Sequence, residues 1–408
     1  MSVDAGVFGR ALLAASAADP ADLLDVLAAE LRHRTGALDL AMHLIDYRLM
    51  SLRPIDLAGA ARVARPQPVD GSPLGAAFRT QRVTREAVPV GQLCHVPISV
   101  RGQRLGVLTG TFTEPPATAD REVLRALALA AAHALLEMSA GTDLYETTRR
   151  HARLSVAAEM QWQLLPARAF ETRDFAIAGH LEPALRVAGD AYDFALNDRT
   201  LTAVVIDATS TGGAPSGLTT LVITALRNAR RSGLSLAEQA SLASELLWQH
   251  SAGQQQAAAL LLHLDAADQA ASIVDAGSPA VIRRRDGVFE PQPLEPQTPL
   301  GMFADTDYTE QPIDLRPGDR VYLLTDGALG PELNIAAVLD LLTAEQHGGH
   351  QAPPESIRRL VAALTHGGHE PDDDITLVCL DWHPRAGDAQ QLMQAKCLPP
   401  GQRREQDA

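Results

Sequence analysis

Cysteine, aromatic residues and positive charge are all scarce in this chain. It has three cysteines in 408 residues and 4% aromatic residues. No two cysteines have the spacing of a zinc site, and so few cannot form a disulfide framework for a chain of this length. Cys94 and Cys379 lie in β-like runs, so we expect both to be inert core residues.

Acidic residues outnumber basic ones by 50 to 35, which gives a formal net charge of −15. An acidic chain repels nucleic-acid phosphates and anionic lipid, so we expect no nucleic acid and no membrane among its partners. There is no membrane-length apolar run and no signal-peptide pattern, which predicts a cytoplasmic protein. The length favours two domains with a connecting segment.

The N-terminal part alternates between helical and β-like patterns. Residues 21–35 place four leucines on one stripe of an amphipathic helix, and β-like runs follow at 39–45, 91–100 and 105–112. A glycine-containing turn between the last two runs predicts a hairpin. This order resembles a GAF domain, with CHVPI and GVL matching its last two strands. The resemblance implies a GAF-like α/β sensor domain at 1–118, which either takes a small-molecule or protein input or serves as a dimer scaffold.

A nearly continuous helical pattern follows over residues 119–165, with Leu124, Leu127, Ala131 and Ala134 at a spacing that fits a two-helix seam. Two arrangements stay open. Either the helices pack on the domains at each end, or they form a dimeric signalling helix that carries a conformational change. We predict a helical signalling linker over 119–165 and a homodimer.

Four aspartates in the C-terminal half stand beside apolar runs, where strands end: Asp190 in VAGDAYDF, Asp207 in TAVVIDAT, Asp326 in VYLLTDG and Asp373 in DDDITL. Each alone is also typical of a turn, a helix cap or a solvated loop. Together they supply hard oxygen ligands, which Mg²⁺ and Mn²⁺ prefer. Nearby Asp193 is expected to be a structural hydrogen-bonding group. Most strands follow one another by turns, including an Asp286-Gly287 hairpin, which favours an α+β fold with antiparallel sheets.

The motifs of this half occur in a fixed order: EMQWQLLP, VAGDAYDF, VVIDATSTGG, DAGSP, TPLGMF, PGDRVYLLTDG and DDDITL. The series resembles the SpoIIE/RsbU-type phosphatase domain, of the metal-dependent PPM class of protein serine/threonine phosphatases. The resemblance implies an α-β-β-α sandwich of two antiparallel sheets at residues 166–385. The polar remainder, 386–408, is predicted to be disordered.

Carried over to this chain, the resemblance implies catalytic metal ligands at Asp190, Asp207, Asp326 and Asp373. The backbone carbonyl of Ala208 would be a further ligand, and Asp374 a supporting group. Two ions, Mn²⁺ or Mg²⁺, would then activate a water for attack on phosphorus. The implied activity is hydrolysis of phosphoserine or phosphothreonine on a protein, a STAS-type anti-sigma-factor antagonist in a signal transduction pathway.

The sequence also departs from the family pattern at several loop positions. Ser210-Thr211-Gly212 and Ser278 stand where histidine-containing motifs are usual, and Gly330 replaces an acidic residue. These changes leave all four metal aspartates in place. They keep an alternative open, in which the chain is a weakened or inactive regulatory module that binds a phosphoprotein partner.

Overall fold

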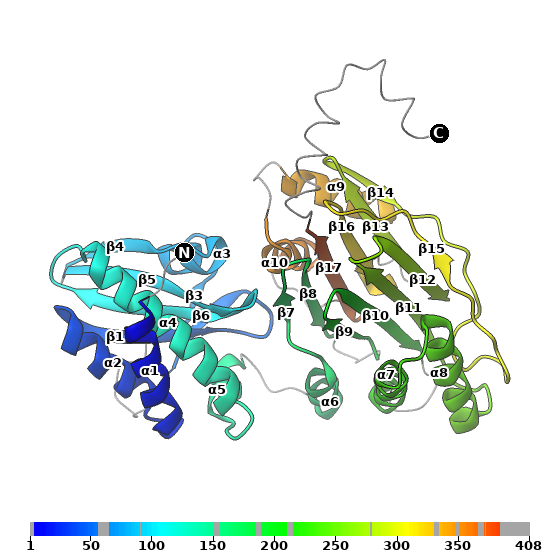
Figure 1. The fold of residues 1–408 in the computed structure, drawn as a ribbon, viewed down its shortest axis with the longest axis horizontal. Helices are drawn as coiled ribbons and strands as arrows, with labels where there is room; N and C mark the ends of the chain where they lie inside the picture. Colours follow the sequence, from blue (N-terminus) through cyan, green and yellow to red (C-terminus); the bar gives the residue numbers. More distant parts are fainter. Residues whose placement is uncertain are drawn as a thin grey trace, which may run out of the picture. The chain divides into compact units, whose positions relative to one another are not determined.

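The computed structural model describes residues 4–55, 65–89, 91–150, 155–184, 189–209, 215–277, 280–329, 334–346, 351–365, 371 and 373–383. The chain divides into two compact units, Met1–Arg153 and Leu154–Ala408. Figure 1 shows their elements in chain order. Within the described residues, no helix is long and apolar enough to cross a membrane.

The first unit contains one six-stranded antiparallel sheet in the order β3-β2-β1-β6-β5-β4. Its strands are β1 (Ala37–Ile45), β2 (Ser51–Pro54), β3 (Gln67–Pro68), β4 (Thr84–Val88), β5 (Gly91–Val100) and β6 (Gln103–Phe112). Its helices are α1 (Ala5–Ala17), α2 (Leu23–Arg34), α3 (Pro73–Thr80), α4 (Thr118–Met138) and α5 (Leu144–Arg149). The predicted hairpin is confirmed, because β5 pairs with β6 around Arg101 and Gly102, which both have positive φ.

Successive side chains along each strand point to opposite sides of the sheet, so the sheet has two different faces. One face packs against α1, α2 and α4 in the larger apolar core of the unit, and α3 packs against the other. Leu124, Leu127, Ala131 and Ala134 of α4 are all buried in the larger core. The apolar stripe of α4 is therefore buried within the first unit, as expected if the helix packs on its own domain.

The range 119–165, predicted as a linker, is divided between the two units. α4 and α5 lie in the first unit, whereas α6 (Val156–Leu164) lies in the second. Residues 151–154, which include the boundary, lie outside the described residues. A signalling role for this range stays a prediction.

The second unit contains two sheets, in the orders β15-β12-β11-β10-β9 and β14-β13-β16-β17-β8-β7, and all their pairings are antiparallel. The strands of the first are β9 (Ala191–Asn197), β10 (Thr200–Thr209), β11 (Gln256–Asp265), β12 (Ala270–Ala276) and β15 (Gln311–Pro312). Those of the second are β7 (Ala169–Glu171), β8 (Phe175–Glu182), β13 (Ala280–Arg285), β14 (Val288–Pro291), β16 (Arg320–Leu324) and β17 (Ile375–Trp382).

Three apolar cores show that this unit is layered. Side chains of both sheets, such as Val205 and Leu323, meet in one core. A second core lies between the first sheet and the helices α7 (Pro215–Arg231) and α8 (Leu236–Ser251). A third lies between the second sheet and α9 (Ile335–Gln346) and α10 (Pro353–Leu364), so the helix pairs flank the two sheets (Figure 1). The predicted α+β class with antiparallel sheets is confirmed.

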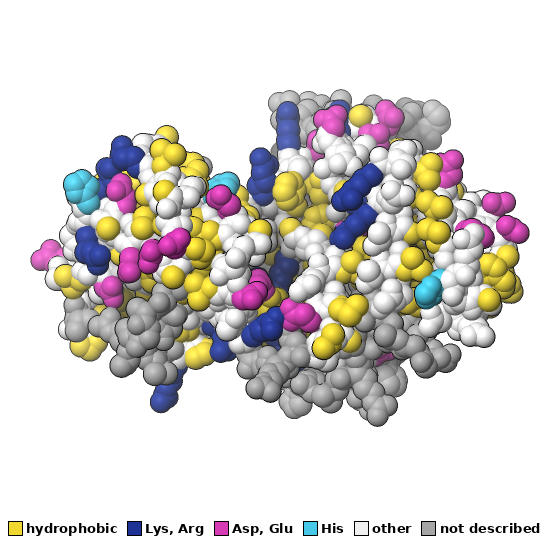
Figure 2. Space-filling view, turned by 90° about the horizontal axis from the view of Figure 1, so that it is seen from below, with side chains coloured by type: hydrophobic (Ala, Val, Ile, Leu, Met, Phe, Trp, Pro, Cys, Tyr) yellow, Lys and Arg dark blue, Asp and Glu magenta, His cyan; other side chains and the backbone are white. Residues whose placement is uncertain are grey.

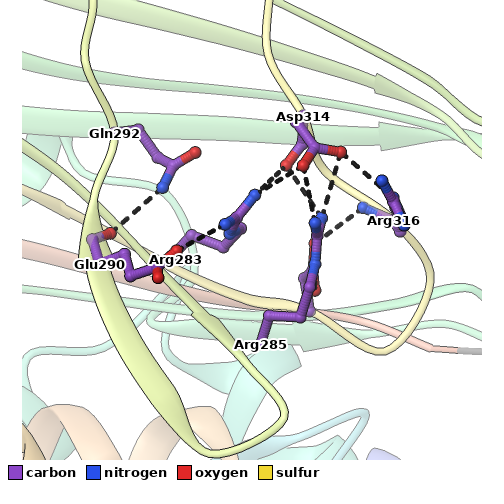
Figure 3. A network of polar contacts seen from close by, with 7 residues as sticks. Arg283, Arg285, Glu290, Gln292, Asp314 and Arg316 are labelled. Atoms are coloured by element: carbon purple, nitrogen blue, oxygen red, sulfur yellow. Dashed lines mark hydrogen bonds and ion pairs between the residues drawn. The ribbon is translucent and has the colours of Figure 1, made fainter. Parts of the chain in front are cut away.

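The predicted Asp286-Gly287 turn is also confirmed, since β13 and β14 pair around it and both residues have positive φ. Next to it, Arg283 and Arg285 of β13 converge on Asp314 (Figure 3). Hydrogen bonds from Arg285 hold the pKa of Asp314 near 2, well below its usual range. These arginines are therefore engaged in holding a loop against β13. On the face shown in Figure 2, basic side chains are dispersed among acidic and uncharged ones.

A buried ion pair joins the two central strands of the second sheet. Arg320 of β16 and Asp381 of β17 are direct cross-strand partners. The guanidinium donates from Nε to one carboxylate oxygen at 2.6 Å and from a terminal nitrogen to the other at 2.7 Å. Both side chains are less than a tenth exposed. Removing one charge would leave the other buried without its counter-ion.

We therefore expect Asp381→Asn to lower the free energy of unfolding of the second unit by about 3 kcal/mol, measured by denaturant titration. The control is Glu290→Gln, which removes a partly exposed partner of Arg283 and should cost less than about 1 kcal/mol. Equal losses for the two variants would contradict the importance of the buried pair.

Candidate metal centre

The register of β9 and β10 brings two of the predicted aspartates together. Val205 of β10 points between the two sheets, and Asp207, two residues further on, continues on the same face. Ala191 of β9 pairs with Ile206, so Asp190 follows as the neighbour of Asp207 where this pairing ends. Asp190 is 2% exposed, whereas Asp207 is half-buried.

The second sheet supplies the other two aspartates at the same end of the layer. Asp326 follows β16 and begins a short 3-10 helix, Asp326–Ala328, and Asp373 comes just before β17. β16 and β17 are paired, which brings the two aspartates to one edge. Thr325 links the sheets, because its hydroxyl donates to Oδ2 of Asp190 at 2.6 Å.

Electrostatics show that the four carboxylates share one site. The pKa of Asp190 is raised well above its usual range. Burial is the largest cause, and the negative charge of Asp207 is the second. The pKa of Asp207 is raised to about 7, mainly by burial. The charge of Asp326 and a hydrogen bond with it raise this pKa further, and the charge of Asp373 adds to the shift. The pKa of Asp373 is raised as well, by burial and by Asp326, although a backbone hydrogen bond opposes the shift. In the described chain, the groups that act on these three pKa values include no lysine or arginine.

Asp374 has a different role from its neighbour Asp373. Its carboxylate accepts hydrogen bonds from the backbone amides of Ala184, at 2.8 Å, and Gly189, at 3.1 Å. It also accepts from Nε2 of Gln161 at 3.0 Å, and the same nitrogen donates to the carbonyl of Asp190 at 3.1 Å. Asp374 is 1% exposed and holds the segment that carries Asp190. This geometry suits the supporting group that the sequence resemblance implies.

The donor chemistry of the site fits a hard divalent cation. Clustered carboxylates without a basic partner repel one another, and a cation relieves that repulsion. One buried acceptor beside them, Oε1 of Gln161, has no hydrogen-bond partner among the described residues, and metal-bound water would supply a donor. Throughout the residues that the structure describes, no group of three or more His, Cys, Asp or Glu side chains has the spacing of a formed metal site. The ligand roles of the four aspartates therefore stay predictions.

Ala208 follows Asp207 in β10, is fully buried and pairs with Ala257. Its carbonyl as a metal ligand also stays a prediction. Ser210, Thr211, Gly212, Ser278, Gly330 and Asp372, at the positions that differ from the family pattern or adjoin the site, lie outside the described residues.

Asp193 is confirmed as a structural group. Its carboxylate binds Arg227 of α7 at 2.7 Å and Arg230 at 2.9 Å, and it is 2% exposed. Arg227 also donates to the carbonyl of Leu164, at the end of α6. Asp193 therefore attaches α7 and α6 to the strand that follows Asp190.

Sequence reasoning missed Gln161 and Thr325 as parts of the site. Gln161 lies in the motif EMQWQLLP, which carried the family resemblance but no role for this side chain. It is 1% exposed in a helix, and a buried glutamine is unusual enough to be a signal. Thr325 directly precedes Asp326 at a strand end, a position at which the sequence analysis considered only the aspartate.

Gly327 lets the two carboxylate segments of the second sheet approach each other. A Cβ atom at this position would lie 2.0 Å from the carbonyl oxygen of Asp374 and 3.4 Å from the Cβ of Asp373. No side chain fits at the shorter of these distances, so any substitution must push Asp326 and Asp373 apart.

We therefore predict that Gly327→Ala weakens Mn²⁺ binding by about tenfold or more, measured by calorimetry, because misplaced ligands lower metal affinity. Gly217→Ala is a matched control, since nothing lies within 4 Å of a Cβ at that helical position. Unchanged Mn²⁺ affinity in a folded Gly327→Ala protein would show that this contact does not position the carboxylates.

Comparison with known proteins gives one family match. Residues 197–383 match the family described as Stage II sporulation protein E (SpoIIE). This range includes Asp207, Asp326 and Asp373, and it begins just after Asp190. The match covers somewhat less than half of the chain and does not extend to the first unit, for which the GAF-like resemblance stays a prediction. No curated protein matches the sequence.

Solved structures are similar at low identity. The RsbU and RsbW domains of a Mycobacterium tuberculosis protein are 20% identical, with a TM-score of 0.46 over 57% of this chain and 70% of that one. RsbX in complex with magnesium is 14% identical, with a TM-score of 0.42 over 52% and 98%. The PP2C phosphatase domain of SpoIIE from Bacillus subtilis, with a fragment of its regulatory domain, is 18% identical, with a TM-score of 0.43 over 52% and 64%. On the family match, the second unit contains a SpoIIE-family domain.

Proposed function

We propose that the chain is a cytoplasmic, metal-dependent protein phosphatase that hydrolyses phosphoserine or phosphothreonine on a protein. The observation that carries this proposal is the gathering of Asp190, Asp207, Asp326 and Asp373 at one end of the layer between two sheets. Among the described residues, no basic group contributes to the pKa shifts of Asp190, Asp207 and Asp373. The SpoIIE family match over residues 197–383 supports it, together with the motifs that resemble SpoIIE/RsbU-type phosphatases of the PPM class.

The residues at the site would have different roles. Asp190, Asp207, Asp326 and Asp373 would hold Mn²⁺ or Mg²⁺, in the proposal two ions. Bound there, the cations would supply a water of lowered pKa and neutralise the phosphoryl oxygens. Thr325 and Asp374 hold the segment around Asp190 in place, the first by its hydroxyl and the second through backbone amides. Cys94 and Cys379 would take no part, because both are buried, as predicted.

The substrate class and the regulation are parts of the same proposal. We infer a phosphorylated STAS-type anti-sigma-factor antagonist as substrate, from the SpoIIE/RsbU resemblance. The first unit would receive a signal, as a homodimer, and α6 would pass it to the metal centre through Gln161. Supporting this route, α6 is the first described element after the boundary between units, and Gln161 contacts both Asp190 and Asp374.

The decisive experiment measures phosphate release from p-nitrophenyl phosphate and from a phosphorylated STAS protein in Mn²⁺. Asp207→Asn should lower the rate by about a hundredfold or more, because it removes a charged ligand from the centre. Asp198→Asn, an exposed substitution in the β9–β10 turn, is the matched control and should leave the rate unchanged. Equal rates for wild type and Asp207→Asn would make the metal assignment wrong.

A second candidate function is a module that binds the phosphoprotein without turnover. Ser210, Thr211, Ser278 and Gly330, which depart from the family pattern, favour it. Calorimetry separates the two, since retained phosphoprotein binding without Mn²⁺ binding or phosphate release would support the second.

Regulation has its own test, because removal of residues 1–153 takes away the whole first unit and leaves α6 intact. We expect the rate of the shortened protein, or its Mn²⁺ requirement, to differ from that of the full chain. Identical rates at every Mn²⁺ concentration would rule out control by the first unit.

A further inference from the structure

Two large apolar side chains are exposed on one turn of the second unit. Met302 is 37% exposed and Phe303 is 53% exposed, in the loop between β14 and β15 (yellow in Figure 1). Among the exposed large apolar side chains that the structure describes, no other two are adjacent in the sequence, and only Phe303 is aromatic. Exposed apolar residues usually lie singly on a protein surface, so this exposed pair indicates a contact surface.

The turn that presents the exposed pair is held firmly on α8. Gly301 has a φ of +77°, and a Cβ atom at this position would lie 2.4 Å from the side chain of Leu247. The backbone amide of Gly301 donates to the hydroxyl of Ser244 at 3.0 Å. On the other side of the pair, the hydroxyl of Tyr308 donates to the carbonyl of Thr298 at 3.0 Å. These contacts fix the turn, so the exposed pair is presented in one position.

The exposed pair is close to the edge of the sheet that carries Asp207. Leu300 forms an antiparallel bridge with Ala257, and Ala257 pairs with Ala208, the residue after Asp207. Neighbouring strands are about 4.8 Å apart, so the backbones of Leu300 and Ala208 are about 10 Å apart. Phe303 comes three residues after Leu300, which places it at most about 20 Å from Ala208. A folded domain of about 100 residues, with a radius of gyration of about 13 Å, is wide enough to cover both places.

The surface around the exposed pair is acidic. Residues 292–315, which contain the pair, include no lysine, arginine or histidine. α8, β11 and β12, which adjoin this loop, contain no lysine or arginine. The exposed acidic residues of the loop are Glu295, Asp305, Asp307 and Glu310. A partner that covers the exposed pair would meet negative charge around it, so basic residues on the partner would complement this acidic rim.

An apolar centre with a charged rim is the usual anatomy of a contact between proteins. A protein substrate also has a surface beyond its phosphoryl group, and binding energy from that surface gives specificity. We propose that Met302 and Phe303, with the acidic rim, form a docking surface for the phosphoprotein substrate. The substrate would dock through an apolar spot flanked by basic residues while its phosphoryl group lies at the proposed metal centre. The identity of the partner rests on the proposed phosphatase function.

The first test measures binding of a phosphorylated STAS protein to the full chain by calorimetry in Mn²⁺. Phe303→Ser should weaken binding by about tenfold or more, because a buried aromatic anchor contributes on this scale, and Met302→Ser should weaken it less. Val288→Ser is the matched control and should bind like wild type. Val288 is 58% exposed, but it lies beside the β13–β14 turn of the other sheet.

Hydrolysis of p-nitrophenyl phosphate separates docking from misfolding. This small ester cannot extend from the metal centre to the exposed pair, so Phe303→Ser should hydrolyse it at the wild-type rate while the KM for the phosphoprotein rises. A folding defect would instead lower both rates.

Asp207→Asn separates the docking surface from the phosphatase assignment. This variant should lose hydrolysis, and adding Phe303→Ser to it should weaken phosphoprotein binding by the same factor as in wild type. If wild type hydrolysed neither substrate, the phosphatase assignment would fail, and the binding comparison would still test the docking surface.

The acidic rim has a test of its own. Asp305→Asn combined with Asp307→Asn should weaken phosphoprotein binding by about threefold at low salt, because two attractive charges are lost. Added KCl should lower the affinity of wild type more than that of this double variant.

Three results would overturn the proposal. The first is no detectable binding of the phosphorylated STAS protein to wild type. The second is equal affinity of wild type and Phe303→Ser for that protein. The third is an equal dependence on salt for wild type and the double aspartate variant, because the rim would then not recognise charge.

Discussion

The second unit depends on bringing negative charges together where two antiparallel sheets end. Asp190 and Asp207 come side by side because β9 and β10 are paired in one register, and a slip of one residue would turn Asp207 toward the helices. The cost of this arrangement is visible in the raised pKa of Asp207, near 7. The structure resists that repulsion with neutral and backbone groups, namely the hydroxyl of Thr325 and the amides that hold Asp374. A basic residue would remove the repulsion, but it would also compete with a cation for the carboxylates.

The supporting contacts also explain why α6 matters beyond its small size. Its glutamine, Gln161, reaches both the carbonyl of Asp190 and the carboxylate of Asp374, and its last turn is bound by Arg227 through the carbonyl of Leu164. Arg227 in turn binds Asp193 on β9. A displacement of α6 would therefore disturb contacts on both sides of Asp190 in the sequence. This follows from the contacts within the second unit alone, and it holds whatever the first unit does.

Features that involve neighbouring residues could be predicted from the sequence, whereas contacts between distant residues could not. The Asp286-Gly287 turn and the β5–β6 hairpin involve neighbouring residues with strong turn preferences, and both were predicted. The aspartates were found because each ends or precedes an apolar run, although their convergence came from the family resemblance and not from spacing. Gln161 was missed because its partner Asp374 is 213 residues away, and nothing in the local pattern of α6 indicates that contact.

Phosphate chemistry at this site would place unusual demands on a cation. A phosphoryl group carries negative charge, and the carboxylates that would surround it carry more of the same sign. Many phosphate sites use arginine for recognition, yet Arg283 and Arg285 of β13 are engaged with Asp314 and Asp319, and Arg227 and Arg230 with Asp193. Among the described residues, no basic group acts on the pKa values of Asp190, Asp207 and Asp373, so attraction for a phosphoryl group would have to come from the metal ions themselves. On this reasoning, metal dependence would govern substrate binding as well as the activation of water.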